Sequence, residues 1–220
     1  MTTSAEVVEL ATPVGLGRVH VTRPRAARGV LALGHGAGPS ITTVDLVAAV
    51  ESAVGAGWAV ALVEQPWLVA GGRVAPRPPV LDSAWVPLVA ALRGRGGPLA
   101  RVRGPLVVGG RSAGARVACR TAGVVGAGAV LCLSFPLHAP GKPHVSRADE
   151  LGVPLGAGLP VHVVQGERDP FGGPAEVLAA QPALAGRVHP VPGTHTIARA
   201  GGPLVAEAVR LALADLPFWE

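Results

Sequence analysis

The sequence predicts an α/β fold: a mostly parallel, open sheet with helices on both faces. Two or three Val- and Leu-rich segments open the chain, and strand-like and helix-like segments then alternate to its end. The chain has 220 residues, a length that α/β folds often reach undivided, so we expect one domain over residues 1–220, without a cap domain. Its 49% of hydrophobic and 15% of charged residues exclude a disordered protein.

Short apolar segments bounded by Pro and Gly are typical of strands. The segment 57–63 carries almost no polar residue, as expected for a strand that helices cover on both faces. We expect strands at 5–10, 16–22, 29–33, 57–63, 105–108, 128–133, 161–165 and 187–191.

Longer segments with apolar residues three or four apart are typical of helices. In the first of them Asp45 lies in the first turn, where a carboxylate interacts favourably with the helix dipole. Pro87 lies inside the second and argues against an undisturbed helix there. We expect helices at 44–55, 80–92, 113–121, 174–180 and 203–213, and irregular chain at 64–79 and 134–151.

The net charge of +5 raises the question of a nucleic-acid partner. The basic residues are 18 Arg and one Lys, Lys142, and they are scattered along the sequence rather than grouped in a stripe. Aromatic residues, which stack on bases in many nucleic-acid-binding proteins, are few: no Tyr, three Phe and four Trp. We therefore expect no nucleic-acid partner.

Several further classes find no support in the sequence. The longest run free of polar residues and Pro, 122–133, is shorter than the roughly 20 residues that span a bilayer, so we expect no membrane association. The first ten residues carry Glu6 and Glu9 but no basic residue, unlike a signal peptide. Cys119 and Cys132 lie in apolar segments without metal-ligand spacing, which favours buried, reduced thiols in a cytoplasmic protein. No metal is expected.

The segment around Ser112 carries the main chemical signal. Gly110-x-Ser112-x-Gly114 lies between an expected strand and an expected helix, which is the context of a nucleophile elbow. In such an elbow the serine occupies a strained turn, and the glycines keep side chains away from the crowded backbone. A plain strand-to-helix turn in a Gly-rich chain is the alternative interpretation of the same string.

Two further strand ends supply a base and an acid. Asp169 follows the strand 161–165, and His195 follows the strand 187–191. Because the carboxyl ends of parallel strands meet at one edge of a sheet, we expect both side chains to lie near Ser112. A serine nucleophile needs a base and a group that orients the base, and His195 and Asp169 fit those roles. Asp149 and Glu150 are rival acids, but no strand directly precedes them.

With Ser112, Asp169 and His195 in this order, the sequence resembles the α/β-hydrolase superfamily over nearly its whole length. It is most similar to the small lidless branch that includes dienelactone hydrolases. Those enzymes use a cysteine where this chain has Ser112, so their substrate is not carried over. The segments 110–116, 165–171 and 135–138 also resemble a family of predicted actinobacterial hydrolases, whose eukaryotic relatives include a testis-expressed protein and a subunit of a chromatin acetylation complex.

The resemblance implies an oxyanion hole. Gly34-His35-Gly36-Ala37-Gly38 resembles the His-Gly segment that follows the third strand of these hydrolases. It implies that the backbone amides of Ala37 and Ala113 bind the developing oxyanion.

Five residues are expected to line the substrate pocket: His35, Gly36, Trp67, Arg111 and His138. Arg111 either binds a substrate carboxylate or braces the elbow from beneath. His138 either lines the pocket or is a solvated loop histidine, and Trp67 either walls the pocket or caps the core.

Nucleotide-binding patterns fail. The dinucleotide fingerprint would need glycine at position 39, which is Pro39, and a phosphate loop would need Ser or Thr after Lys142, where Pro143 stands.

The expected function is therefore a cofactor-independent serine hydrolase acting on small soluble acyl esters. The alternative is a non-catalytic interaction module that kept the fold. No oligomeric state is predicted.

Overall fold

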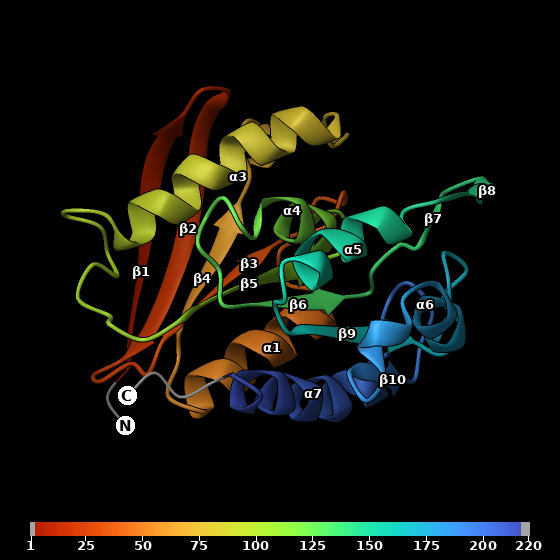
Figure 1. The fold of residues 1–220 in the computed structure, drawn as a ribbon. Helices are drawn as coiled ribbons and strands as arrows, with labels where there is room; N and C mark the ends of the chain where they lie inside the picture. Colours follow the sequence, from red (N-terminus) through yellow and green to blue (C-terminus); the bar gives the residue numbers. More distant parts are fainter. Residues whose placement is uncertain (1–2, 217–220) are drawn as a thin grey trace.

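The computed structural model describes residues 3–216, in which one large sheet lies between two layers of helices (Figure 1). The eight strands follow the order β1-β2-β4-β3-β5-β6-β9-β10. The first two strands pair antiparallel with each other, β2 pairs antiparallel with β4, and every other pair in this sheet is parallel. This confirms the predicted fold class, and the structure contains no separate cap domain.

Each predicted strand is present, with ends that differ by a few residues at most. The strands β3, β6 and β9 are buried along their whole length because helices cover both faces of the sheet. The strands are β1 (Thr3–Thr12), β2 (Gly15–Pro24), β3 (Val30–Gly34), β4 (Ala59–Glu64), β5 (Leu106–Arg111), β6 (Ala129–Leu133), β9 (Val161–Gly166) and β10 (Val188–Val191).

The predicted helices are α1 (Val44–Gly55), α3 (Pro78–Arg93), α4 (Ala113–Thr121), α6 (Pro174–Ala180) and α7 (Gly202–Ala214). In Figure 1, α1 and α7 lie below the sheet and α3 and α4 above it. The helix α3 continues through Pro87, although proline removes a helical hydrogen bond. Trp85 and Leu88, on either side of the proline, are fully buried. This packing stabilises the helix and offsets the lost hydrogen bond at Pro87.

The expectation of irregular chain at 64–79 and 134–151 is wrong in part. The first segment contains the short helix α2 (Pro66–Val69); the second contains the strands β7 (His138–Ala139) and β8 (Lys142–Ser146) and the start of the helix α5 (Ala148–Gly156). Short 3-10 helices also occur at Pro182–Leu184 and Arg199–Gly201. The strand β8 is exposed throughout, and α5 contains Pro154, so neither shows the periodicity that sequence analysis detects.

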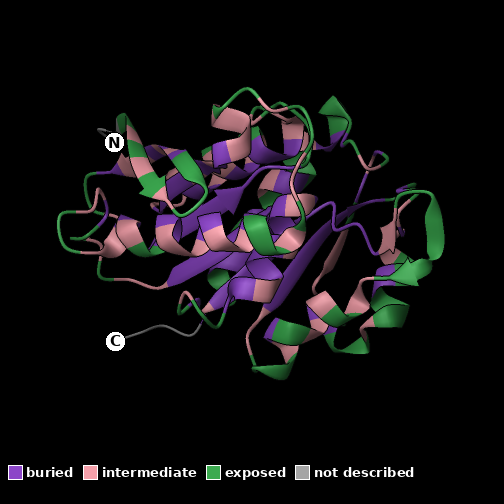
Figure 2. Ribbon diagram, turned by 90° about the horizontal axis from the view of Figure 1, so that it is seen from above, coloured by how far each residue is buried: buried purple, intermediate pink, exposed green. Residues whose placement is uncertain are grey.

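Two apolar cores, one on each face, hold the layers together; the strands between the helices are almost entirely buried (Figure 2). Along β3, Ala32 packs into the core under α3 and α4, whereas Leu31 and Leu33 pack against α1 and α7. The prediction of buried, reduced thiols is confirmed: Cys119 and Cys132 are buried and free, with their Sγ atoms 3.5 Å apart. Their hydrogen bond and their burial raise the pKa of the Cys119 thiol.

The parallel strands give the sheet two unlike edges. The carboxyl ends of β3, β5, β9 and β10 lie at one edge, which we call the carboxyl edge, and their amino ends lie at the other, the amino edge. In Figure 1 the segments that follow the carboxyl ends, including β7, β8 and α6, lie on the right. In open parallel sheets, ligands bind outside the carboxyl ends of the strands.

Candidate active site

Three side chains from separate strand ends form one hydrogen-bonded chain at the carboxyl edge. Ser112 follows β5, Asp169 follows β9 and His195 follows β10. The Oγ of Ser112 lies 2.8 Å from Nε2 of His195, and Nδ1 of His195 lies 2.9 Å from Oδ2 of Asp169. These distances allow the histidine to accept the serine proton while the carboxylate holds the other ring nitrogen in its protonated form.

Ser112 has a strained backbone, with φ 53° and ψ −109°. Non-glycine residues in such a region cost on the order of 1–3 kcal/mol and need surroundings that hold them there. Those surroundings are glycines: a Cβ at Gly110 or at Gly114 would clash with the carbonyl oxygen of Gly34. The close approach of β3, β5 and α4 thus depends on the glycines of the predicted elbow, and it presents the Ser112 side chain at the edge of the sheet.

Asp169 is held by donors on both of its oxygens. Its Oδ1 accepts a hydrogen bond from the Phe171 amide at 2.8 Å, and its Oδ2 accepts one from Nε2 of Gln165 at 3.0 Å, in addition to the bond from His195. The Asp169 side chain is fully buried. Gln165 is itself fully buried. Its Oε1 accepts a hydrogen bond from the Phe135 amide, and its Nε2 donates one to the Phe135 carbonyl. The carboxylate is therefore fixed in position before any substrate binds.

His195 is fixed by contacts on its ring and on its backbone. The ring of Phe171 packs edge-on against the imidazole, with centroids 4.6 Å apart and an interplanar angle of 77°. The carbonyl oxygen of His195 accepts a hydrogen bond from Nη2 of Arg111 at 2.8 Å. Phe171 lies two residues after Asp169, and Arg111 lies next to Ser112. The two residues that contact His195 therefore come from the segments that carry Asp169 and Ser112.

Arg111 links this turn to the first turn of α1. Its Nε lies 3.5 Å from Oδ2 of Asp45, and the Asp45 residue is only 1% exposed. A buried pair of this kind must stay together, because either charge left alone in the interior is costly. Two of the guanidinium nitrogens thus face the protein, which agrees with the bracing interpretation of Arg111; its expected role in substrate binding stays a prediction.

The loop after β3 passes beside Ser112. A Cβ at Gly36 would lie 3.6 Å from the Cβ of Ser112 and 2.8 Å from Nη1 of Arg111, so glycine allows this loop to approach the elbow. Nδ1 of His35 donates to the Gly36 carbonyl at 2.7 Å, and Nε2 accepts from the Gln65 amide at 3.1 Å. Burial lowers the pKa of His35, which favours the neutral ring that this pair of bonds requires.

These bonds set the direction of two backbone amides. Because the Gly36 carbonyl points at the His35 ring, the N–H of Ala37 in the same trans peptide points the opposite way. Ala113 is the first residue of α4, where the backbone N–H has no partner within the helix and the helix dipole favours negative charge. Both predicted oxyanion donors thus have a structural reason to be available.

A small cavity adjoins Gly36 and Ala113. The space in it that the centre of a water molecule can reach is about 10 Å³, about what one water molecule needs. Trp67 forms part of its wall and lies against His35 with ring centroids 5.4 Å apart. The remaining wall residues are Gly34, Gln65, Ala75, Leu81, Gly114 and Val117. Trp67 therefore walls a cavity beside Ala113, one of the predicted oxyanion donors, and its expected place in the substrate pocket stays a prediction.

His138 lies behind Phe171 rather than beside Ser112. Its backbone amide donates to the Phe171 carbonyl at 2.8 Å, and its Nε2 lies 3.3 Å from a carboxylate oxygen of Glu176. Its expected contact with substrate stays a prediction. The rival acid Glu150 is engaged elsewhere: it accepts two hydrogen bonds of 2.7 Å from Arg116.

Comparison with known proteins places this arrangement in a family. A family model described as an α/β-hydrolase domain matches residues 27–197, most of the chain. The chain belongs to the α/β-hydrolase family. No curated protein sequence matches it. The narrower resemblance to actinobacterial hydrolases and their eukaryotic relatives stays a prediction.

Solved structures share the α/β-hydrolase fold over nearly the full chain. A lidless α/β serine hydrolase from Xanthomonas campestris is 18% identical, with a TM-score of 0.75 over 100% of this chain and 99% of its own. A dienelactone hydrolase from Anabaena variabilis is 14% identical, with a TM-score of 0.71 over 98% and 99%. A serine hydrolase homologue from Coxiella burnetii is 14% identical, with a TM-score of 0.70 over 96% and 97%. At these identities the likeness shows the shared fold.

Sequence analysis of this α/β hydrolase missed three residues that position the site: Asp45, Gln165 and Phe171. Asp45 was interpreted only through the helix dipole, although its carboxylate pairs with Arg111. Gln165 is a polar residue near the carboxyl end of the buried strand β9, just before the loop that carries Asp169, a signal that could have marked it. Phe171 carries no such signal, because its contact with His195 depends on how two loops fold together.

In the part of the chain that the structure describes, no three His, Cys, Asp or Glu side chains form a group that could hold a metal ion. Within the same residues, no helix has both the length and the apolar character to cross a bilayer.

Proposed function

We propose that this α/β hydrolase is a cofactor-independent serine hydrolase that cleaves small soluble acyl esters. The observation that carries the proposal is the hydrogen-bonded chain from Ser112 through His195 to Asp169. The strained backbone of Ser112 supports it further, because strain of this kind persists where the position of the side chain matters.

In the first half-reaction Oγ of Ser112 attacks the ester carbonyl carbon, and Nε2 of His195 takes the hydroxyl proton. The carbonyl oxygen becomes an oxyanion, which the amides of Ala37 and Ala113 stabilise. The carbon–oxygen bond to the alcohol then breaks, and His195 returns the proton to the departing alkoxide. An acyl ester of Ser112 remains.

In the second half-reaction water takes the place of the alcohol. Nε2 of His195 accepts a proton from the water as its oxygen attacks the acyl carbon, and the proton then passes to Oγ of Ser112 as the acid leaves. Asp169 keeps the proton on Nδ1 throughout and stabilises the imidazolium that forms in each half. Its bonds from Gln165 and Phe171 hold the carboxylate at that nitrogen.

The site favours short acyl groups. The cavity beside Gly36 and Ala113 has room for about one water molecule, with Trp67 in its wall. An acetyl methyl group is about the largest acyl tail that this space takes without movement of Trp67. We include in the proposal that residues 1–220 form one catalytic domain, and that the two free cysteines reflect a reducing, cytoplasmic location.

Labelling with a fluorophosphonate probe tests the proposal, since this reagent reacts with activated serines. We expect wild-type protein to be labelled at Ser112 and the Ser112→Ala variant to remain unlabelled. Ser134 offers a matched control: it also follows a strand of the sheet and has a positive φ of 50°, but it is fully buried. The Ser134→Ala variant should be labelled as wild type.

Absence of labelling in folded wild-type protein would favour the non-catalytic module instead. Hydrolysis of p-nitrophenyl acetate by the same three proteins should follow the labelling, with Ser112→Ala alone inactive.

A further inference from the structure

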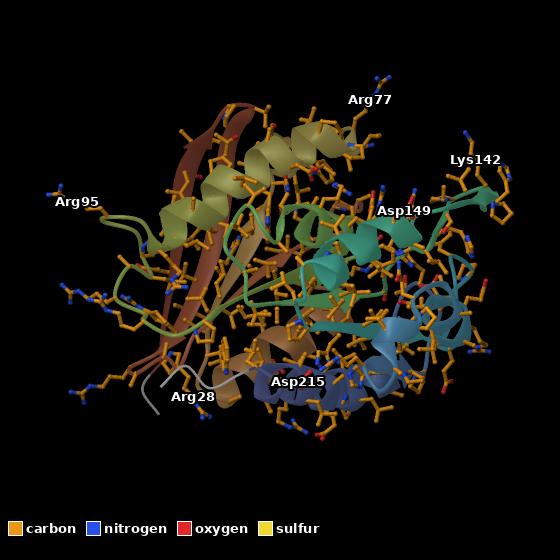
Figure 3. The ribbon with its side chains drawn as sticks, in the orientation of Figure 1. Arg28, Arg77, Arg95, Lys142, Asp149 and Asp215 are labelled. Carbon is orange, nitrogen blue, oxygen red and sulfur yellow. The ribbon has the colours of Figure 1, made fainter. Side chains whose placement is uncertain are left out.

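The arginines that are scattered along the sequence gather in space. Those at the amino edge come from the end of β2 and its connection to β3, and from the end of α3 and its connection to β5: Arg23, Arg25, Arg28, Arg93, Arg95, Arg101 and Arg103. In Figure 3, Arg28 and Arg95 project from the left end of the molecule, whereas Arg77 and Lys142 project from the opposite end. The scatter of arginines along the sequence therefore does not carry over to the surface at this edge.

Four of these arginines line one groove of about 720 Å³. They are Arg23, Arg25, Arg101 and Arg103, and the backbone between them contributes Pro24, Ala26, Ala27, Val102 and Gly104. We call this set of nine residues the arginine groove. Its volume lies in the range of pockets that bind small molecules, roughly 300–1,000 Å³.

Three of the four arginines in the arginine groove carry a charge that no acid of the described residues compensates, whereas Arg23 lies 3.9 Å from Glu6. In residues 3–216 the guanidinium groups of Arg25, Arg101 and Arg103 have neither a hydrogen bond nor an ion pair, and all three residues are exposed. Other arginines of the protein are paired with acids, among them Arg120 with Asp82 at 2.7 Å and Arg116 with Glu150 at 2.7 Å. Like charges gathered in one groove repel each other, and a bound anion relieves that repulsion.

The walls of the groove are held by hydrogen bonds from two arginine side chains to backbone carbonyls. Nη1 of Arg23 donates to the Pro98 carbonyl at 2.8 Å, which ties the end of β2 to the segment before β5. Nη2 of Arg93 donates to the Val102 carbonyl at 3.2 Å. The groove thus keeps its shape while Arg25, Arg101 and Arg103 remain free to contact a ligand, so little order needs to be created on binding.

We propose that the arginine groove binds a small anion that carries two or more phosphate groups. The planar guanidinium matches phosphate oxygens in pairs, and three unpaired arginines around one groove can contact adjacent phosphates together. The groove has no aromatic residue on which nucleic-acid bases could stack. Its size, that of a small-molecule pocket, favours a compact oligophosphate over a membrane surface or a nucleic acid.

This binding site is separate from the proposed active site. Gly104 of the groove lies just before β5 and Ser112 lies just after it, at opposite edges of the sheet. A six-residue strand separates them, which spans roughly 20 Å. The proposal therefore does not depend on the hydrolase activity, and either can fail without the other.

Isothermal titration with inorganic tripolyphosphate tests the proposal on the full chain. We expect one saturable site per chain in the wild type, and affinity lowered at least about tenfold in an Arg101→Gln/Arg103→Gln variant, because each lost arginine removes charge-assisted hydrogen bonds. An Arg73→Gln/Arg77→Gln variant is the matched control: it loses the same charge, from exposed arginines of the loop before α3. It should bind within about twofold of wild type. A thermal melt of each variant verifies its fold.

Three results would overturn the proposal. The first is no saturable binding by the wild type, and the second is an equal loss of affinity in the two double variants. The third is binding of a single-stranded oligonucleotide or of anionic lipid vesicles in the groove while tripolyphosphate fails to bind. The second result would show that net charge alone attracts the anion. The third would show that the groove serves a macromolecular surface. Adding Arg25→Gln to the Arg101→Gln/Arg103→Gln variant should cause a further, smaller loss of affinity. That result would support the inclusion of Arg25 in the binding site.

Discussion

The two edges of the sheet handle charge in opposite ways. At the carboxyl edge the ionisable groups around Ser112 are largely buried and paired: Asp169 with His195, and Asp45 with Arg111. At the amino edge Arg25, Arg101 and Arg103 are exposed and, within residues 3–216, unpaired. Burial makes an unpaired charge costly, whereas water makes it cheap. The paired edge is therefore suited to fixing groups for chemistry, and the unpaired edge to receiving a ligand that brings the missing charge.

Of the substitutions that test the carboxyl edge through its ion pairs, one at Asp169 should lower the catalytic rate most. The Asp169→Asn substitution keeps the shape, but its amide nitrogen must face one of the donors Phe171, Gln165 or His195. The imidazole then loses the partner that sets its tautomer, and we expect kcat for p-nitrophenyl acetate to fall about 10⁴-fold. Steady-state kinetics measure this.

Glu150→Gln provides the control for Asp169→Asn. Glu150 is the rival acid and pairs with Arg116 and Arg120, away from Ser112. It should keep near-normal kcat. The reverse outcome, with Glu150→Gln inactive and Asp169→Asn active, would remove Asp169 from the mechanism.

Arg111→Met tests whether the buried pair positions His195. We expect kcat to fall about 10- to 100-fold with KM for a neutral ester unchanged, since the turn that carries His195 loses its hydrogen bond and misplacement of a reacting group is costly. Stability should fall by about 3 kcal/mol, because Asp45 is left buried without its partner.

Adding Asp45→Asn should recover part of the stability lost in Arg111→Met without restoring kcat. If Arg111 instead binds an anionic substrate group, the single variant would raise KM for an ester with a carboxylate and leave kcat for the neutral ester as in wild type.

Trp67→Ala tests the size of the acyl group. Removing the indole enlarges the cavity beside Gly36 and Ala113, so longer acyl chains should fit. We expect the ratio of kcat/KM for p-nitrophenyl butyrate to that for the acetate to rise at least about tenfold, because the butyryl group is longer by two methylenes and one methylene in an apolar pocket is worth about tenfold or more. An unchanged ratio would place the acyl group elsewhere.

The amino edge also contains one paired cluster, and it predicts a pH effect on stability. His162 lies 3.0 Å from His189 and 3.0 Å from Asp215, which in turn pairs with Arg187. Burial lowers the pKa of both His162 and His189 in the folded protein. The unfolded chain therefore binds more protons near pH 6.5, and stability is full above that value and falls as the pH drops through the lowered folded pKa values.

Urea unfolding between pH 7.5 and pH 5 measures this slope. The midpoint should fall on acidification, and His189→Gln should make the fall shallower without abolishing it, since burial lowers the pKa of His35 as well. A midpoint that rises on acidification would contradict the lowered pKa values of these buried histidines.

The sequence alone predicts the parts of this molecule that depend on local pattern. Ser112, Asp169 and His195 each follow a strand directly, so the alternation of strands and helices is enough to bring them to one edge. The residues that hold them do not follow from pattern: the contact of Asp45 with Arg111 and that of Phe171 with His195 join segments distant in the chain. The same holds for α5, whose Pro154 disfavours a helix and whose buried Leu151 packs it into the core.

The sequence analysis did not predict the gathering of arginines, for a related reason. Arg25 and Arg103 are far apart in the chain and meet only because β3 and β5 are neighbours in the sheet. An even distribution along the sequence therefore does not predict an even distribution on the surface.

Hydrolysis of p-nitrophenyl acetate by the Ser112→Ala variant tests the nucleophile most directly. With a circular dichroism spectrum equal to that of wild type, we predict that kcat falls about 10⁶-fold, to the residual rate that oxyanion donors and binding alone provide. A folded Ser112→Ala variant that keeps activity within about tenfold of wild type would contradict the assignment of Ser112.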